Sequence, residues 1–208
     1  SMVTGNISTV VQSQFKFGFE KLKATFGKLL VVNIFTFSLM PIFLATNTDF
    51  IVNIFFSEQW LLLTELLPIV AVWAFIWGVS SPYSVLFHLY EKESMLFKIQ
   101  CVKFITRLVY LSVAPMYLDF YYYVTGYVVV GSSIQIFQLL VLTRVIGLNV
   151  KSIILNNAKL FLIVALLIFS SIIISYCHES LKFSLSILAV LSSLYLGRNE
   201  IIYIKNNI

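Results

Sequence analysis

The chain has 208 residues, of which 60% are hydrophobic and only 11% are charged. An ordinary soluble domain has roughly 45–50% apolar and 25% charged residues, so this composition excludes a soluble enzyme. The mean hydropathy is +0.95, and the 19 Phe, 11 Tyr and 3 Trp carry more apolar surface than a core of this size hides from water. The net charge of +5 is not gathered into a basic run, and we expect no nucleic-acid partner.

Residues 1–28, which are polar and carry several lysines, precede the first apolar run. Four apolar residues within this segment recur at spacings of four, three and four, as on one face of a helix. They are Phe15, Phe19, Leu22 and Phe26. Residues 1–28 therefore form an amphipathic helix at the membrane interface or a cytoplasmic connection, and the two interpretations are compatible. The segment is not a secretory signal, because its apolar stretch is too short for one.

Six apolar stretches are long enough to cross a membrane. In chain order they are Leu29 to Ala45, Leu61 to Leu89, Met95 to Leu118, Tyr121 to Leu142, Leu160 to Tyr176 and Leu181 to Leu196. The second is longer than the hydrocarbon needs, and we expect Pro68 and residues 78–82 to bend or break it. Residues 121–123 are all Tyr, which is typical of a lipid headgroup boundary. The turns around Asp119 and at 177–180 are so short that the helices they join must be antiparallel neighbours.

These stretches predict an all-α, polytopic membrane protein of about six transmembrane helices with short loops. Residues 1–28 are the interfacial segment, 29–197 the six-helix bundle and 198–208 a cytoplasmic tail. Six spans place both termini on one side, together with the even-numbered connections. All 14 Lys and Arg residues except Lys182 then lie on that side. The positive-inside rule therefore predicts that both termini are cytoplasmic.

No catalytic or metal-binding motif stands out in the sequence. His88 and His178 are expected at opposite membrane faces, with no Cys or carboxylate partner at the spacing of metal ligands. Cys101 and Cys177 are likewise expected near opposite faces, which argues against a disulfide. We expect no enzymatic activity, no metal and no cofactor.

Basic residues inside the third span are the first candidates for a functional site. Lys103 and Arg107 are four residues apart and share a helix face with Gln100. If Lys98 marks the membrane boundary, Arg107 lies roughly 13 Å deep. Two interpretations stay open at this point: the two cations line a polar cavity, or their long side chains reach back to the headgroups.

Polar residues in the fourth span form a second candidate stripe. Its members are Ser132, Gln135, Gln138 and, at the end of the span, Arg144. Gln135 and Gln138 would belong to the same polar path as Lys103 and Arg107. Hydrogen bonds that hold packed helices together explain the stripe equally well.

Three segments follow one another in a distinctive order. Residues 44–60, LATNTDFIVNIFFSEQW, end a span and continue into Phe-Ser-x-x-Trp, residues 64–94 form the next helix with a Pro break, and residues 143–150, TRVIGLNV, have an Arg-x-x-Gly exit from a later span. This order resembles Wzx-type polysaccharide flippases, of the multidrug/oligosaccharidyl-lipid/polysaccharide exporter superfamily. The family usually has Gly where Ser57 stands. Its common Gly-Arg or Gly-Lys pair at the turn after the second segment is absent, and Glu-Lys stands nearby at 91–92.

This resemblance implies a transporter that flips an undecaprenyl-pyrophosphate-linked O-antigen or capsule repeat unit across the bacterial inner membrane. Such transporters have two helix bundles around a cationic cavity and work by alternating access. The family has more spans than this chain, so we expect the C-terminal portion of a flippase. Its expected partners are the lipid-linked oligosaccharide, membrane lipid and the missing N-terminal half of the transporter.

Two alternatives stay open beside the flippase. Another exporter of the superfamily, for drugs or metabolites, is expected to keep a carboxylate at membrane depth, whereas all nine acidic residues here fall near span ends. A membrane enzyme of O-antigen assembly, such as a polymerase, needs a large outer loop or an intramembrane catalytic set. The outer connections of this chain are short.

Overall fold

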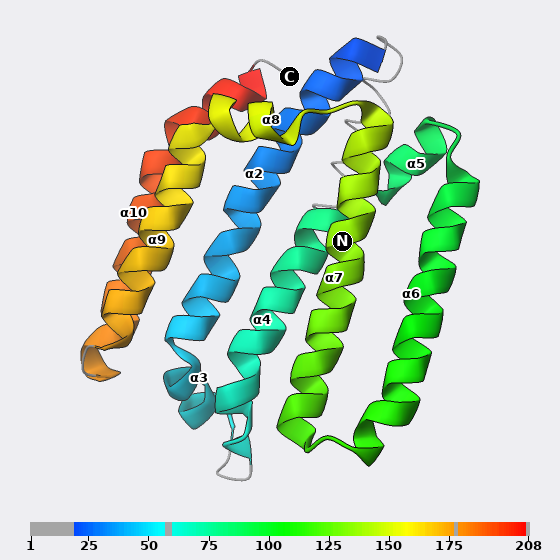
Figure 1. Cartoon of the computed structure of the whole chain (residues 1–208). Coiled ribbons are helices and arrows are strands. Elements are labelled where there is room, and N and C mark those ends of the chain that lie inside the picture. The colour runs from blue at the N-terminus through cyan, green and yellow to red at the C-terminus, as the bar shows by residue number, and fades with distance from the viewer. Residues whose placement is uncertain (1–18, 57–59, 177–178, 207–208) are drawn as a thin grey trace. The chain divides into compact units, whose positions relative to one another are not determined.

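The computed structural model is helical throughout the residues that it describes, which are 19–56, 60–176 and 179–206 (Figure 1). The prediction of an all-α fold is confirmed. In chain order the helices are α2 (Phe19–Thr46), α3 (Thr48–Phe55), α4 (Leu63–Ser80), η2 (Ser81–Ser84), α5 (Val85–Leu89), α6 (Glu93–Val113), η3 (Ala114–Met116), α7 (Phe120–Ile146), α8 (Val150–Asn156), α9 (Ala158–Ser175) and α10 (Glu179–Asn206).

Five segments of the described chain are long and apolar enough to cross a membrane, one fewer than expected from the sequence. They are Thr25–Thr46, Leu63–Leu89, Phe120–Ile146, Ala158–Ser175 and Leu181–Ile202. The expected third span corresponds to α6, which is long enough but carries Lys98, Lys103 and Arg107 within its 21 residues. The chain is a polytopic membrane protein, and α6 is the helix whose charges distinguish it from the five apolar ones.

The first span begins earlier than the sequence indicates. The helix α2 runs without a break from Phe19 to Thr46, so the second half of the expected amphipathic segment continues directly into the span. Phe26 is fully buried, and its ring meets the ring of Tyr83 edge-on at 4.8 Å between centroids. This aromatic residue therefore packs inside the protein. Phe15 lies outside the described residues.

The second span is interrupted where the sequence predicts it. The helix α4 ends at Ser80, a 3₁₀ turn follows over Ser81–Ser84, and α5 resumes at Val85. Pro82 lies in this turn and lacks the N–H that would continue the ladder of α-helical hydrogen bonds. Pro68 lies within α4 and does not end it.

The described helices form two compact units, which are considered separately. The first comprises the described residues within 1–30 and 76–151, and the second those within 31–75 and 152–208. In the first unit α6 and α7 are antiparallel neighbours, as the short turn around Asp119 predicts (Figure 1). The pair is important because its two helices carry most of the polar residues singled out in the sequence.

The second unit has its core between α2 and the antiparallel pair α9 and α10. Val31, Phe35 and Leu39 of α2 pack with Leu160 and Leu167 of α9. The prediction that α9 and α10 are neighbours is confirmed, although the turn residues 177–178 lie outside the described part of the chain.

Small and polar residues join α10 to the preceding part of the second unit. A Cβ on Gly197 would lie 2.6 Å from Cζ of Phe35, so only glycine lets the two helices approach this closely. Asn47, which follows α2, is buried, and its Nδ2 donates a hydrogen bond of 2.8 Å to Oγ of Ser186. Close backbone approach and buried polar bonds are typical of helix packing in a membrane.

Candidate functional site

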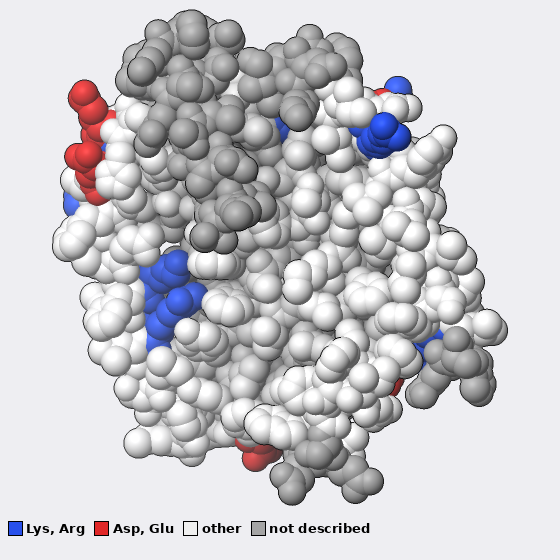
Figure 2. Space-filling model, turned by 180° about the vertical axis from the view of Figure 1, so that it is seen from behind, with Lys and Arg blue, Asp and Glu red and all other residues white. Residues whose placement is uncertain are grey.

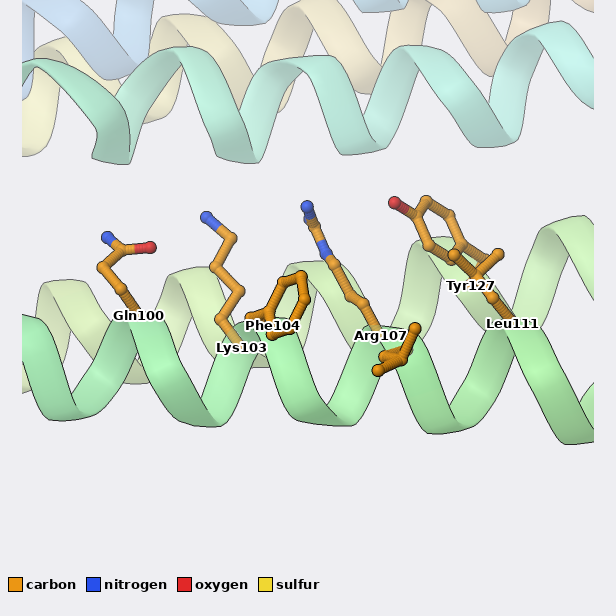
Figure 3. A pocket seen from close by; sticks show the side chains of 7 residues that line it. Gln100, Lys103, Phe104, Arg107, Leu111 and Tyr127 are labelled. Carbon is orange, nitrogen blue, oxygen red and sulfur yellow. The ribbon is translucent and has the colours of Figure 1, made fainter.

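The polar residues of α6 lie on one face of that helix. Gln100, Lys103 and Arg107 are spaced by three and four residues, and their polar ends point away from the helix in the same direction (Figure 3). They line an open hollow of about 370 Å³ beside α7. The other lining residues are Phe104, Leu108, Leu111 and Tyr127. The structure thus brings Lys103 and Arg107 to a single cavity, which we call the cationic hollow.

Two contacts tie the cationic hollow to α7. Nε2 of Gln100 donates a hydrogen bond of 3.5 Å to Oε1 of Gln138. The guanidinium carbon of Arg107 lies 5.4 Å from the ring centroid of Tyr127, in the range of a cation–π contact. The hollow is therefore built by both helices of the pair.

The hydrogen-bonding capacity of Arg107 is largely unused. Its Nε and Nη2 atoms are buried and have no hydrogen-bond partner among the described residues. A guanidinium has five N–H donors in a fixed plane, and leaving them unpaired away from water costs free energy. The arrangement therefore favours an acceptor, such as water or an anion, in the hollow.

Lys103 of the cationic hollow lies far from both ends of α6. Lys103 is the central residue of α6 (Glu93–Val113), so it lies about 15 Å from either end at about 1.5 Å per residue. Gln100 is level with Gln138 and Arg107 is level with Tyr127, and both partners lie within the candidate span Phe120–Ile146. Lys103 is thus level with the middle of a helix that is apolar enough to cross a membrane.

The hollow is positively charged and lacks a compensating acid. No Asp or Glu is among the described residues that line it. The ion pair Lys159–Glu200 at 3.0 Å and the contact of His88 with Glu93 at 3.4 Å involve neither of its cations. Seen from behind, the surface over α6 carries a patch of Lys and Arg side chains among uncharged neighbours (Figure 2).

The polar residues of α7 that the sequence places in one stripe lie in different surroundings. Gln138 contacts the hollow through Gln100, whereas Gln135 is 2% exposed and does not line it. Oε1 of Gln135 and Oγ of Ser132 have no partner in the described part of the chain. Arg144 is exposed, and its position six residues along the helix places it about 120° around the helix from Gln138. The stripe expected from the sequence is therefore not one continuous lining.

The sequence does not single out the tyrosines at the hollow: Tyr127, which lines it, and Tyr110 and Tyr123, which pack on each other between α6 and α7. Oη of Tyr110 donates a hydrogen bond of 2.9 Å to the carbonyl oxygen of Tyr123, and the two rings stack with centroids 5.8 Å apart. The spacing offers a weak signal, because Tyr110 is three residues beyond Arg107 and Tyr127 is four beyond Tyr123. Tyr123, in the run that the sequence predicts at a headgroup boundary, packs on α6.

Neither a metal centre nor a known relative defines the site. Across residues 19–56, 60–176 and 179–206, no group of three or more His, Cys, Asp or Glu could hold a metal ion. Cys101 is a free thiol, and Cys177 and His178 lie outside the described residues. No known protein family, curated protein or solved structure matches the chain. The fold and the site define a polytopic membrane protein with a cationic hollow between two of its helices.

Proposed function

We propose that the chain takes part in flipping undecaprenyl-pyrophosphate-linked O-antigen or capsule repeat units across the bacterial inner membrane. The observation that carries the proposal is the cationic hollow, in which Lys103 and Arg107 have no acidic partner among the lining residues. A pyrophosphate that crosses hydrocarbon loses its hydration, and nearby cations offset that loss. Arg107 suits this role because a guanidinium binds phosphate oxygens through two parallel hydrogen bonds.

The length of α6 supports a polar path over an arrangement in which both cations reach the headgroups. If Lys103 marked the membrane boundary, residues 104–113 of α6 and the 3₁₀ turn η3 (Ala114–Met116) would enter the membrane. At about 1.5 Å per residue in the α-helix and about 2.0 Å in the 3₁₀ turn they span about 21 Å, which is short of the roughly 30 Å hydrocarbon core. A helix placed in this way would not match α7, its antiparallel neighbour, which is long enough to cross.

The turn before α6 departs from the flippase pattern in its residues, because the common Gly-Arg or Gly-Lys pair is absent. Glu91 has a φ of 54° at this turn, a left-handed backbone conformation that glycine adopts without strain. In this proposal the chain is a carrier and not an enzyme, and it works with the spans of the transporter's N-terminal half.

Lipid binding by the full chain in detergent tests the proposal. Undecaprenyl pyrophosphate is the probe, and uncharged undecaprenol is the reference lipid. A charge-assisted hydrogen bond contributes about 1.5–3 kcal/mol, so we expect Arg107→Ala to weaken binding of the probe by roughly 10- to 100-fold. Arg107→Lys should retain part of the affinity, because it keeps the charge and loses the planar fork.

The control variant is Lys182→Ala, which removes a cation from α10. We expect it to bind the probe as the unmodified chain does, and binding of undecaprenol should be equal in all variants. An Arg107→Ala variant that binds undecaprenyl pyrophosphate normally would contradict the proposal.

A further inference from the structure

A second hollow lies on another face of the α6–α7 pair. It measures about 510 Å³, within the range of about 300–1,000 Å³ that is usual for small-molecule sites. Its lining residues are Met95, Lys98, Ile99, Val102, Ser133, Ile134, Phe137 and Val141. Apart from Lys98 and Ser133 these side chains are apolar. We call this hollow the apolar groove.

The apolar groove and the cationic hollow are separate sites. Lys98 and Lys103 are five residues apart, and five residues turn an α-helix by about 140°. No residue lines both hollows. The α6–α7 pair thus has one face with the cationic hollow and another with the apolar groove. The apolar face is suited to contact with lipid.

The groove belongs to one end of the helix pair. On α6 it extends from Met95 to Val102, which is about 10 Å of helix, and Met95 follows shortly after the start of α6 at Glu93. On α7 its last lining residue is Val141, close to the end of that helix at Ile146. An occupant of the groove would therefore lie within one leaflet, with its polar end beside the start of α6 and the end of α7.

Two cations lie beside the groove, Lys98 along its α6 side and Arg144 beyond its end on α7. Lys98 is exposed and lines it directly. Arg144 is exposed and lies one turn beyond Val141, on the face of α7 that also carries Phe137. Of the acids at this end, Glu93 contacts His88 at 3.4 Å rather than Lys98. Glu91 is exposed in the turn before α6.

We propose that the apolar groove binds the acyl chain of an anionic phospholipid, whose headgroup phosphate lies between Lys98 and Arg144. An acyl chain gains little by moving from bilayer hydrocarbon to an apolar groove, because both surroundings are apolar. Selection must therefore come from the headgroup, and two cations select for negative charge. This site does not depend on the proposed flipping of lipid-linked sugars, since it uses other residues on another face.

Native mass spectrometry of the full chain tests the proposal. The chain is released from micelles that contain equimolar phosphatidylglycerol and phosphatidylcholine, and lipids that stay bound are counted. We expect retained phosphatidylglycerol to exceed phosphatidylcholine at least threefold. The double variant Lys98→Gln/Arg144→Gln should lose this preference. Val102→Trp, which fills the groove, should lower the amount of phosphatidylglycerol retained, because the acyl chain can no longer lie below the headgroup.

Matched variants separate the groove from general charge and from the cationic hollow. Lys182→Gln/Arg198→Gln removes two cations from α10 and should keep the preference for phosphatidylglycerol. Arg107→Ala should keep it too, and added inorganic phosphate should not displace the lipid. Circular dichroism checks that each variant keeps its helical content.

Three results would overturn the proposal. The first is equal retention of the two lipids by the unmodified chain. The second is a loss of preference in the α10 double variant or in Arg107→Ala that is as large as in Lys98→Gln/Arg144→Gln. The third is a helical Val102→Trp chain that retains phosphatidylglycerol as before.

Discussion

Gly147 ends α7 in a conformation that other residues adopt only with strain. Its φ is 71°, in the left-handed region, and the N–H of Leu148 donates a hydrogen bond of 2.9 Å to the carbonyl of Thr143. This is the usual glycine cap at the end of a helix. An L-residue with a Cβ costs roughly 1–2 kcal/mol in this region.

We expect Gly147→Ala to lower the free energy of unfolding by about 1 kcal/mol, measured by denaturant titration in mixed micelles. Gly147→Asn should cost less, because asparagine tolerates the left-handed region better than alanine. A loss from Gly147→Asn equal to or larger than that from Gly147→Ala would show that backbone strain is not the cause.

At the scale of the helices, α6 and α7 approach closely at Gly126. A Cβ at this position would lie 2.9 Å from Cζ of Tyr110 and closer still to its hydroxyl. The hydroxyl donates a hydrogen bond to the carbonyl of Tyr123, so the ring can move away from the new Cβ only if that bond is broken. The glycine thus lets the tyrosine of α6 lie across α7 beside the cationic hollow.

We expect Gly126→Ala to destabilise the chain by about 1–3 kcal/mol, the usual cost of overpacking. Because the explanation is a clash with Tyr110, removal of that ring provides the control. In a Tyr110→Leu background the clash is absent, and the same substitution should cost little. A double-mutant cycle on the free energy of unfolding measures the coupling, and additive effects of the two substitutions would contradict the explanation.

For the whole molecule, the role of α6 decides where the termini lie. If α6 crosses the membrane together with the five apolar segments, both termini lie on the same side, which the distribution of Lys and Arg predicts to be the cytoplasm. If α6 does not cross, an odd number of spans places the termini on opposite sides.

Cysteine labelling in intact cells distinguishes these topologies. In a background without Cys101 and Cys177, we expect Lys21→Cys and Asn206→Cys to react with a membrane-impermeant maleimide only after the membrane is opened. Ser57→Cys, between the first two spans, should react in intact cells and serves as the positive control. Labelling of Asn206→Cys in intact cells, with Lys21→Cys protected, would instead favour five spans.

Much of the fold could be predicted from the sequence because its determinants are local. Span positions follow from the hydropathy of neighbouring residues, and the expected fifth span, Leu160 to Tyr176, nearly coincides with α9. The break at Pro82 follows from the chemistry of one residue. The short helices α3, of eight residues, and α8, of seven, could not be predicted, because neither is long enough for a periodic pattern to stand out.

The sequence by itself determined that Lys103, Arg107 and Gln100 share a helix face, because the helical period alone requires it. The tertiary structure decided what this face meets: Tyr127 and Gln138 lie opposite, and Gln135 does not line the hollow. Such contacts depend on how one helix is rotated and packed against the other. Hydropathy and spacing describe each helix separately, so neither shows which faces of α6 and α7 come together.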